Sequence, residues 1–380
     1  MNTATPPSAR ILVLNAGSST LKYALFEDSR LDESATQELV GTVTIQNAVH
    51  SLCVRESFQP IDVVAYRVVH GGVDMISPTE ITPEVVQKLK ATVHLAPLHQ
   101  KPAIDAIETA MAAVPNAFHA ACFDTAFHAT MPAEEKRLAL PREMYDLGIR
   151  RFGFHGLSYE SIVRQLPTLS VRAAQGRTVA CHLGNGASLC GMVGSQSKTT
   201  TMSFTPQDGL IMGTRAGRLD SGVILHLLQN NHSLQDVQQI LTKQSGLLGI
   251  SSVSSDMREL MRRSPEHFES HQAITMFCNS VAREIASAAT FIGGLDALVF
   301  TAGIGENCDW VRSQVVKKLA WIGGELDEAK NQANATQLHA SSSSFEILRV
   351  ATDEQSIIAG HARTIWNHAK SLATKHTDES

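Results

Sequence analysis

RILVLNAGSSTLKYALFE (residues 10–27) places two apolar strands around a short break of Asn, Gly and Ser. RTVACHLGNGASLCGMVG (residues 177–194) repeats this arrangement. Apolar runs interrupted by such turn residues predict β-hairpins. Two similar hairpins predict an internal duplication, in which each half presents one hairpin turn to a common cleft.

Composition narrows the class of protein. The chain has 380 residues, 43% of them hydrophobic and 18% charged, which is enough for two globular domains. A net charge of −5 argues against nucleic acid or an acidic membrane surface as the main partner. No apolar stretch predicts a secretory signal or a membrane span. Six scattered cysteines predict free, mostly buried thiols in a reducing cytoplasm.

The remaining segments alternate between strand and helix patterns, which predicts an α/β protein. Strands are expected within residues 63–72, 117–128, 295–303 and 344–351. The strand within 117–128 is expected to deliver Asp124, Thr125 and His128 at its end. Helices are expected at 82–97, 102–114, 158–166, 221–230, 233–243, 271–292, 305–323 and 353–375.

Three glycine-containing segments are suited to phosphate binding: NAGSSTLK (15–22), HLGNGASL (182–189) and TAGIGEN (301–307). Glycine lets backbone N–H groups approach an anion, and nearby side chains add further donors. None matches a Walker loop, and the third segment lacks the last glycine of a dinucleotide fingerprint. Each alone is more simply a turn or a helix cap. Together the three segments favour the binding of a nucleotide.

Five charged or titratable residues accompany these segments. Arg67 lies within an apolar strand and needs an anionic partner, either a structural ion pair or a ligand. Arg215 lies in a glycine-rich loop. Asp124, His155 and Glu354 each have a structural alternative, as a turn residue, a core histidine or a first-turn acid. Cations, carboxylates and phosphate loops in one chain favour phosphoryl transfer.

The motifs RVVHGG, LAPLH, FDTAFHATMP, GIRRFGFHGLS, HLGNGASL, FTPQDGLIMGTRAG, FTAGIGEN and TDEQSIIA, with NAGSSTLK, resemble the acetate kinase family from Asn15 to Ala359. The resemblance implies two duplicated actin-like ATPase (ribonuclease H-like) domains with a cleft between them. We expect residues 1–125 plus 355–380 to form an acyl and phosphate domain. Residues 126–354 are expected to form the nucleotide-binding domain.

The resemblance also implies site residues. Asp124, His155, Arg215 and Arg67 match catalytic positions, and Asn15 and Glu354 match the metal site. The acyl-substrate positions are Arg67, Val69, Leu98, His99, Phe154 and Pro206. The nucleotide positions are Ser18, Thr20, Lys22, His182, Leu183, Gly184, Asn185, Gly186, Asp256, Met257, Arg258, Gly303, Ile304, Gly305, Glu306 and Asn307.

The activity implied is reversible, Mg²⁺-dependent transfer of the ATP γ-phosphoryl group to acetate, with Mn²⁺ as an alternative metal. A cytoplasmic homodimer is implied as well. A small apolar acyl pocket favours acetate and leaves propionate open. The rivals are a propionate-preferring or butyrate kinase, a pyrophosphate-dependent relative, and an actin- or Hsp70-like ATP-binding protein. Departures from the family pattern include Leu157 and Tyr159, where it has Thr and His.

Overall fold

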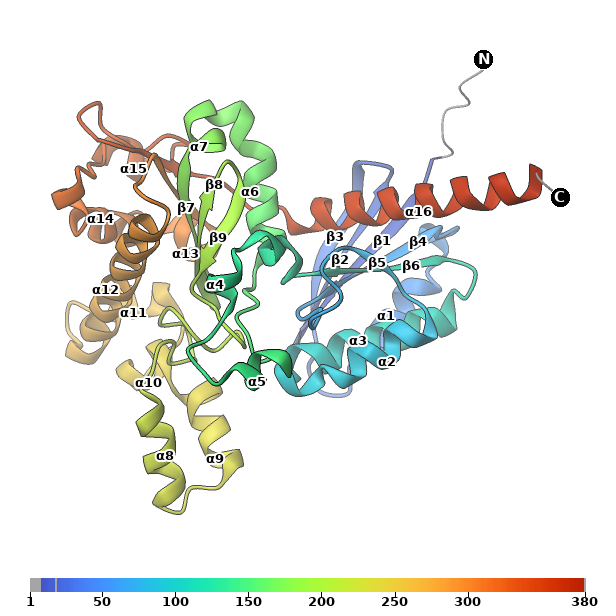
Figure 1. Ribbon diagram of the computed structural model, residues 1–380, viewed down its shortest axis with the longest axis horizontal. Helices are drawn as coiled ribbons and strands as arrows, with labels where there is room; N and C mark the ends of the chain where they lie inside the picture. Colours follow the sequence, from blue (N-terminus) through green and yellow to red (C-terminus); the bar gives the residue numbers. More distant parts are fainter. Residues whose placement is uncertain (1–7, 18, 379–380) are drawn as a thin grey trace. The chain divides into compact units, whose positions relative to one another are not determined.

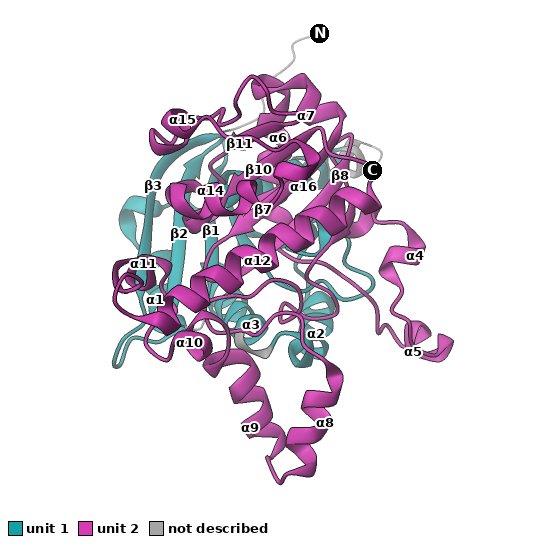
Figure 2. Ribbon diagram, turned by 90° about the vertical axis from the view of Figure 1, so that its left-hand side faces the viewer, with its two compact units in different colours: residues 1–127, 353–380 teal, residues 128–352 magenta. Residues whose placement is uncertain are grey.

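The chain forms two compact units, and each is described by itself (Figure 2). Unit 1 comprises Met1–Phe127 and Asp353–Ser380, and unit 2 comprises His128–Thr352. The computed structural model describes residues 8–17 and 19–378, without the side chains of residues 97–98 and 375–378.

Unit 1 is built on a six-stranded sheet with the order β3-β2-β1-β4-β6-β5. The predicted first hairpin is present, since β1 and β2 pair antiparallel from Arg10↔Glu27 to Ala16↔Leu21. β4 and β6 continue the sheet in parallel with β1. The strands are β1 (Arg10–Ala16), β2 (Thr20–Glu27), β3 (Arg30–Glu38), β4 (Val63–Val68), β5 (Thr79–Glu80) and β6 (Phe118–Phe123).

Helices cover both faces of this sheet (Figure 1). The long helix α16 runs along one face in contact with β1, β4 and β6, whereas α3 packs on β1 and β4 together with α1 and α2 on the other. Burial on both faces explains why β1 and β4 are apolar almost throughout. The helices are α1 (Ile45–Cys53), α2 (Pro83–Ala91), α3 (Pro97–Ala113) and α16 (Glu354–Asp378), with short 3₁₀ turns at Glu56–Phe58 and Val93–Leu95.

Unit 2 contains the second sheet, with the order β11-β10-β7-β8-β9. β7 and β8 form the second predicted hairpin, paired antiparallel from Arg177↔Val193 to Leu183↔Ala187. β10 lies parallel to both β7 and β11. The strands are β7 (Arg177–Leu183), β8 (Ala187–Val193), β9 (Gln196–Thr200), β10 (Ala297–Thr301) and β11 (Glu346–Arg349).

The two sheets share one plan. Reading β9-β8-β7-β10-β11 against β3-β2-β1-β4-β6 gives the same order and the same strand directions at every pairing. Each outer hairpin also carries a register shift, between Leu25 and Phe26 in one sheet and between Gly191 and Met192 in the other. The duplication predicted from the two hairpins is therefore visible in the topology.

The helices of unit 2 pack around its sheet and extend beyond it. α12 packs across β7, β8 and β9, while α6 and α7 contact β7. α8 and α9 form a hairpin that projects from the rest of unit 2 (Figures 1 and 2). The helices are α4 (Ala133–Lys136), α5 (Arg142–Asp146), α6 (Gly156–Leu169), α7 (Val171–Gln175), α8 (Ser221–Gln229), α9 (Leu234–Gln239), α10 (Gly246–Ser251), α11 (Met257–Arg263), α12 (Phe268–Phe291), α13 (Ala302–Asn307), α14 (Asp309–Lys317) and α15 (Glu328–Gln332).

Two sequence predictions are corrected here. His128 does not stand at the end of β6, because a 3₁₀ turn (Ala126–Thr130) follows the strand and buries the ring, with Nε2 2.9 Å from the Phe154 carbonyl oxygen. The single helix expected over 305–323 is divided at Cys308 into α13 and α14, and it ends in a 3₁₀ turn, Ala320–Ile322.

Other features agree with the composition. Five cysteines are buried, Cys308 is partly exposed, and all six are free thiols, as predicted. Within residues 8–17 and 19–378, no helix combines the length and apolar character that crossing a membrane requires.

Candidate active site

Arg67 and Asp124 form a bidentate ion pair in unit 1. Nε and Nη2 of Arg67 donate to Oδ1 and Oδ2 of Asp124 at 2.9 and 2.6 Å. The pair forms because β4 and β6 run parallel with Arg67 opposite Cys122, so both strands end at the same edge. The Asp124 side chain is only 2% exposed and that of Arg67 19%, so the carboxylate is largely removed from water.

Two further predicted residues meet the same guanidinium. Oδ1 of Asn15, near the end of β1, lies 3.4 Å from Nη1 of Arg67. Oε2 of Glu354, the first residue of α16, lies 3.9 Å from Nε. Burial acts to lower the pKa of the Arg67 guanidinium, but the charges of Asp124 and Glu354 outweigh burial and raise that pKa. Arg67 is therefore a permanent cation surrounded by oxygen atoms.

The other predicted residues of unit 1 are more dispersed. Lys22 pairs with Asn15 across the β1–β2 hairpin, and its side chain is exposed. Thr20 closes the hairpin turn by accepting the Gly17 N–H at 2.8 Å through its carbonyl oxygen. Val69 is buried directly after β4, and His99 lies in the first turn of α3. Ser18 and the Leu98 side chain lie outside the described residues.

His155 occupies a constrained position in unit 2. It is the N-cap of α6 and has left-handed backbone angles, φ 58° and ψ 23°. Its Nδ1 lies 2.8 Å from Oγ of Ser188, and its ring stacks on that of His182 with 4.1 Å between centroids. A non-glycine residue in this conformation is uncommon and persists only where surrounding contacts hold it.

Arg215 converges with His155 on the turn of the β7–β8 hairpin. A Cβ atom added to Gly186 would lie 2.7 Å from Nη2 of Arg215 and 3.4 Å from Nε2 of His155. Nη1 of Arg215 donates to the Pro206 carbonyl oxygen at 2.5 Å. A side chain at position 186 would displace the end of Arg215, so glycine leaves both groups room to approach the backbone.

Arg215 has a charge that unit 2 does not neutralise. Burial lowers the pKa of its guanidinium to about 10. Among the described residues of unit 2, no carboxylate lies within ion-pair distance of it. A partly buried cation without a carboxylate partner is costly, and a bound anion offsets that cost.

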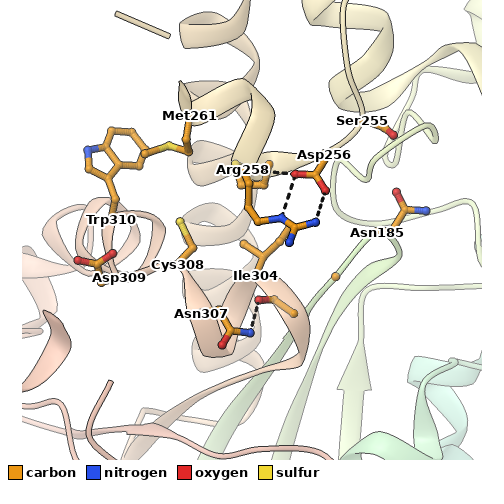
Figure 3. Close-up of a pocket in the computed structure, with 13 residues that line it drawn as sticks. Asn185, Ser255, Asp256, Arg258, Met261, Ile304, Asn307, Cys308, Asp309 and Trp310 are labelled. Carbon is orange, nitrogen blue, oxygen red and sulfur yellow. Dashed lines mark hydrogen bonds and ion pairs between the residues drawn. The ribbon is translucent and has the colours of Figure 1, made fainter. Parts of the chain in front are cut away.

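A cavity of about 740 Å³ lies beside the same hairpin (Figure 3). Eight of its lining residues match predicted nucleotide contacts: Gly184, Asn185, Asp256, Met257, Arg258, Gly303, Ile304 and Asn307. Asp256 is the N-cap of α11 and also pairs with Arg258 at 2.9 Å. Hydrogen bonding to Arg258 lowers the pKa of the Asp256 carboxyl.

Sequence reasoning missed the other walls of this cavity: Ser255, Met261, Cys308, Asp309 and Trp310. Figure 3 shows Met261 on α11 beside the Trp310 ring on α14. A rare tryptophan three residues after a glycine segment was the available signal, but it was assigned to a helix. Met and Trp provide a flat apolar surface of the kind that an aromatic base stacks on.

The structure does not bring every predicted nucleotide residue to this cavity. Leu183 and Gly305 are buried away from it, and His182 stacks on His155. The Glu306 carboxylate accepts the Ala302 and Thr352 N–H groups at 2.8 and 3.2 Å, so it holds the start of α13 in place.

The hairpin turn joins the cavity to the Arg215 loop. Gly213 donates its N–H to the Asn185 carbonyl oxygen at 2.9 Å, and a Cβ atom on Gly213 would collide with the Asn185 side chain. The cavity, Gly186, Arg215 and His155 thus follow one another along one surface of unit 2.

A family model described as the acetokinase family matches residues 45–360. The chain is 40% identical to the acetate kinase of Methylocella silvestris, covering 92% of this chain and 96% of that one. It is 37% identical to the acetate kinase of Rhizobium meliloti, covering 92% and 97%.

Solved structures of a propionate kinase and an acetate kinase are also similar to this chain. The propionate kinase of Francisella tularensis superposes with a TM-score of 0.87 at 32% identity, covering 94% of this chain and 99% of that one. The acetate kinase of Porphyromonas gingivalis gives 0.84 at 30% identity, covering 94% and 100%. The predicted fold class is confirmed as two α/β units with duplicated sheets, a fold shared with these acetate and propionate kinases.

Proposed function

This chain belongs to the acetokinase family, and we propose that it is an acetate kinase, which transfers the γ-phosphoryl group of ATP reversibly to acetate and forms acetyl phosphate and ADP. The observation that carries the proposal is the sequence of features in unit 2. A cavity that suits a nucleoside leads along Gly184–Gly186 to Arg215 and His155. Arg215 is a partly buried cation with no carboxylate at ion-pair distance among the described residues of unit 2.

The nucleotide would be held in two parts. The base would lie in the cavity between α11 and the α13–α14 segment, against Met261 and Trp310. The phosphates would extend along the hairpin turn, where backbone N–H groups and Arg215 favour negative charge. Arg215 and His155 would then stabilise charge on the phosphoryl oxygens in the transition state.

The acceptor would be held by Arg67. Nε and Nη2 of Arg67 are engaged by Asp124, whereas among the described residues Nη1 makes only the long contact to Asn15 and offers donors to a carboxylate. Acetate is already an anion at neutral pH, so no general base is required. Asp124 acts in this proposal as the residue that orients Arg67. Phosphoryl transfer requires donor and acceptor in line, so the proposal assigns residues of both units to one reaction.

Mg²⁺ is part of the proposed reaction, and the residues present fit it. Asn15 and Glu354 supply an amide and a carboxylate oxygen, both within 4 Å of one guanidinium. Mg²⁺ prefers oxygen ligands and is commonly bound by one or two protein groups together with substrate phosphates. When bound, the ion neutralises phosphate charge. Mn²⁺ suits the same oxygen ligands.

Acetate is preferred over propionate in this proposal. The predicted acyl-pocket residues Val69, Phe154 and Pro206 are buried, and curated relatives at 37–40% identity are acetate kinases. Because a propionate kinase is among the similar structures, the acyl preference needs a direct measurement.

The test is acyl phosphate formation from Mg-ATP with acetate, propionate or butyrate, trapped with hydroxylamine. We expect the highest kcat/KM with acetate and a decline with chain length. Arg215→Ala should reduce kcat by at least about 100-fold. Arg218→Ala is the matched control, because Arg218 is in the same loop but is 70% exposed and pairs with Glu284. Equal activity in both variants would reject the role of Arg215.

We also propose that the chain forms a homodimer through α8. Although α8 has the sequence SGVILHLLQ, none of its residues is buried. Val223, Leu225 and Leu228 are 41%, 58% and 40% exposed, on a hairpin that projects from unit 2. An exposed apolar patch of this kind marks an interaction surface.

A further inference from the structure

A chain of buried hydroxyl groups ends on the imidazole of His155. Oγ of Ser188 lies 2.8 Å from Nδ1 of His155 and 2.5 Å from the hydroxyl oxygen of Tyr159. Ser188 and Tyr159 are fully buried. Tyr159 follows His155 by one turn of α6 and donates its backbone N–H to the His155 carbonyl oxygen at 3.1 Å, so both side chains reach the same strand, β8.

The hydrogen bonds from Tyr159 through Ser188 to His155 have a defined donor-to-acceptor direction. Burial raises the pKa of the Tyr159 phenol well above its ordinary value. The phenol is therefore protonated at neutral pH, and its hydroxyl lies 2.5 Å from Oγ of Ser188. Its own proton is then available to Ser188, and the single Ser188 proton is available to Nδ1 of His155.

The orientation of His155 makes its tautomer important. With Nδ1 accepting from Ser188, the proton of the neutral ring is on Nε2. Nε2 is the atom that faces Gly186 and the Arg215 guanidinium. The left-handed backbone of His155 and the stacked His182 ring fix the direction of the imidazole further.

We propose that Ser188 and Tyr159 are positioning residues that hold His155 as the Nε2–H tautomer, so that it donates a hydrogen bond to the phosphoryl group being transferred. The inference rests on the proposed function for its catalytic meaning. The tautomer itself is a property of the free protein and can be measured without substrate.

The protein also contains a matched control pair, Tyr66 and His119. The Tyr66 hydroxyl lies 2.7 Å from Nδ1 of His119, in a pair that is buried in unit 1, whereas His155 belongs to unit 2. Tyr66→Phe therefore removes the same kind of buried tyrosine–histidine contact. Any effect of lost burial or packing alone should appear in Tyr66→Phe as well as in Tyr159→Phe.

The experiment measures ring ¹⁵N chemical shifts of histidine-labelled protein, with His155→Asn used to assign the signal. We expect the wild type to show a protonated Nε2 and an unprotonated Nδ1. Ser188→Ala and Tyr159→Phe should give a mixture of tautomers, whereas Tyr66→Phe should match the wild type. A protonated Nδ1 in the wild type, or an unchanged tautomer in Ser188→Ala, would overturn the proposal.

Kinetics provide the second measurement. Loss of one hydrogen bond of ordinary strength should lower kcat by about tenfold in Ser188→Ala, with KM for ATP and acetate nearly unchanged. In the Ser188→Ala background, Tyr159→Phe should add little, because Tyr159 acts through Ser188. Additive losses of kcat in the double variant would contradict the proposal that Tyr159 acts through Ser188. If the wild type phosphorylates no acid at all, the proposed function fails, while the NMR result still decides the tautomer.

Discussion

Asp124 accepts hydrogen bonds from Arg67 with both carboxylate oxygens, at 2.9 and 2.6 Å, on a side chain that is only 2% exposed. The carboxylate thereby fixes the plane of the guanidinium and directs Nη1 toward Asn15. Planar bidentate pairing is a property of arginine that lysine cannot reproduce.

Removing this pairing should affect both stability and turnover. Asp124→Ala leaves Arg67 without its main partner, so we expect a loss of about 3 kcal/mol in the free energy of unfolding. Asp124→Asn preserves the shape and should cost less stability, yet still lower kcat at least about tenfold because the guanidinium is no longer held. Urea denaturation and steady-state kinetics measure the two effects. Wild-type kcat in Asp124→Asn would show that orientation of Arg67 is unimportant.

Gly186→Ala should inactivate the enzyme without unfolding it. The added methyl group would lie 2.7 Å from Nη2 of Arg215, which is the end of a flexible side chain and can be displaced. We expect kcat/KM to fall by about 100-fold, while the unfolding midpoint stays near that of the wild type. Gly222→Ala is the control, because Gly222 is near the start of α8, outside the proposed active site, and its added Cβ would come no closer than 3.2 Å to another atom, Oδ1 of Asp220. It should retain kcat within about threefold.

Glu354→Gln should weaken the use of magnesium. The substitution keeps the side-chain shape but removes one charge from the oxygen set around Arg67. We expect the Mg²⁺ concentration for half-maximal activity to rise several-fold, and EDTA to abolish activity in every variant. The neighbouring Asp353→Asn is the control, because Asn can still accept the Ser356 N–H that Asp353 accepts at 3.1 Å. A similar shift in both variants would argue against a metal role for Glu354.

His128 should make the fold sensitive to mild acid. Burial lowers the pKa of its imidazole to about 4, whereas the unfolded chain titrates near 6.5. Between these values the unfolded state binds a proton that the folded state does not, so stability falls as the pH falls. The expected loss between pH 7.5 and 5 is about 2 kcal/mol in urea denaturation. His128→Gln should lose less across this range. Burial also lowers the pKa of His119, so part of the acid sensitivity should persist.

Leu225→Lys should disrupt the proposed homodimer. It places a charge on the α8 surface where the wild-type leucine is 58% exposed. We expect light scattering after size exclusion to give the mass of two chains for the wild type and of one chain for the variant. Leu372→Lys, at a leucine of α16 that is 46% exposed, should leave the mass unchanged. A wild-type mass of 41.1 kDa would reject the dimer.

The parts of the fold that were predictable are those in which local pattern and burial agree. The two hairpins were recognisable because apolar strands flank turn residues, and α2 because Thr82 and Pro83 mark its start. β3 was missed because Arg30–Glu38 is exposed along nearly its whole length and has no apolar alternation. Its position depends on pairing with β2 rather than on its own sequence.

The residues of the candidate site also divide into those that local pattern could predict and those that it could not. Arg67 was identified because a charge within an apolar strand demands a partner, and Asp124 is that partner. Trp310 and Met261 were missed because each belongs to an ordinary helical pattern. Only the fold of unit 2 brings α11 and α14 to the same cavity. No local signal could show that two separate helices share a wall.

The path of the chain has a consequence for synthesis on the ribosome. Unit 2 is one continuous stretch, His128–Thr352, and all of it is synthesised before the α16 helix. The first part of unit 1 precedes unit 2, but α16, which covers β1, β4 and β6, is made only after unit 2. During elongation the apolar face of the first sheet therefore stays uncovered until α16 is made. A nascent chain with such an exposed apolar face is prone to aggregate. Translation that stops before Glu354 would release this face uncovered, and Arg67 would never meet its second carboxylate.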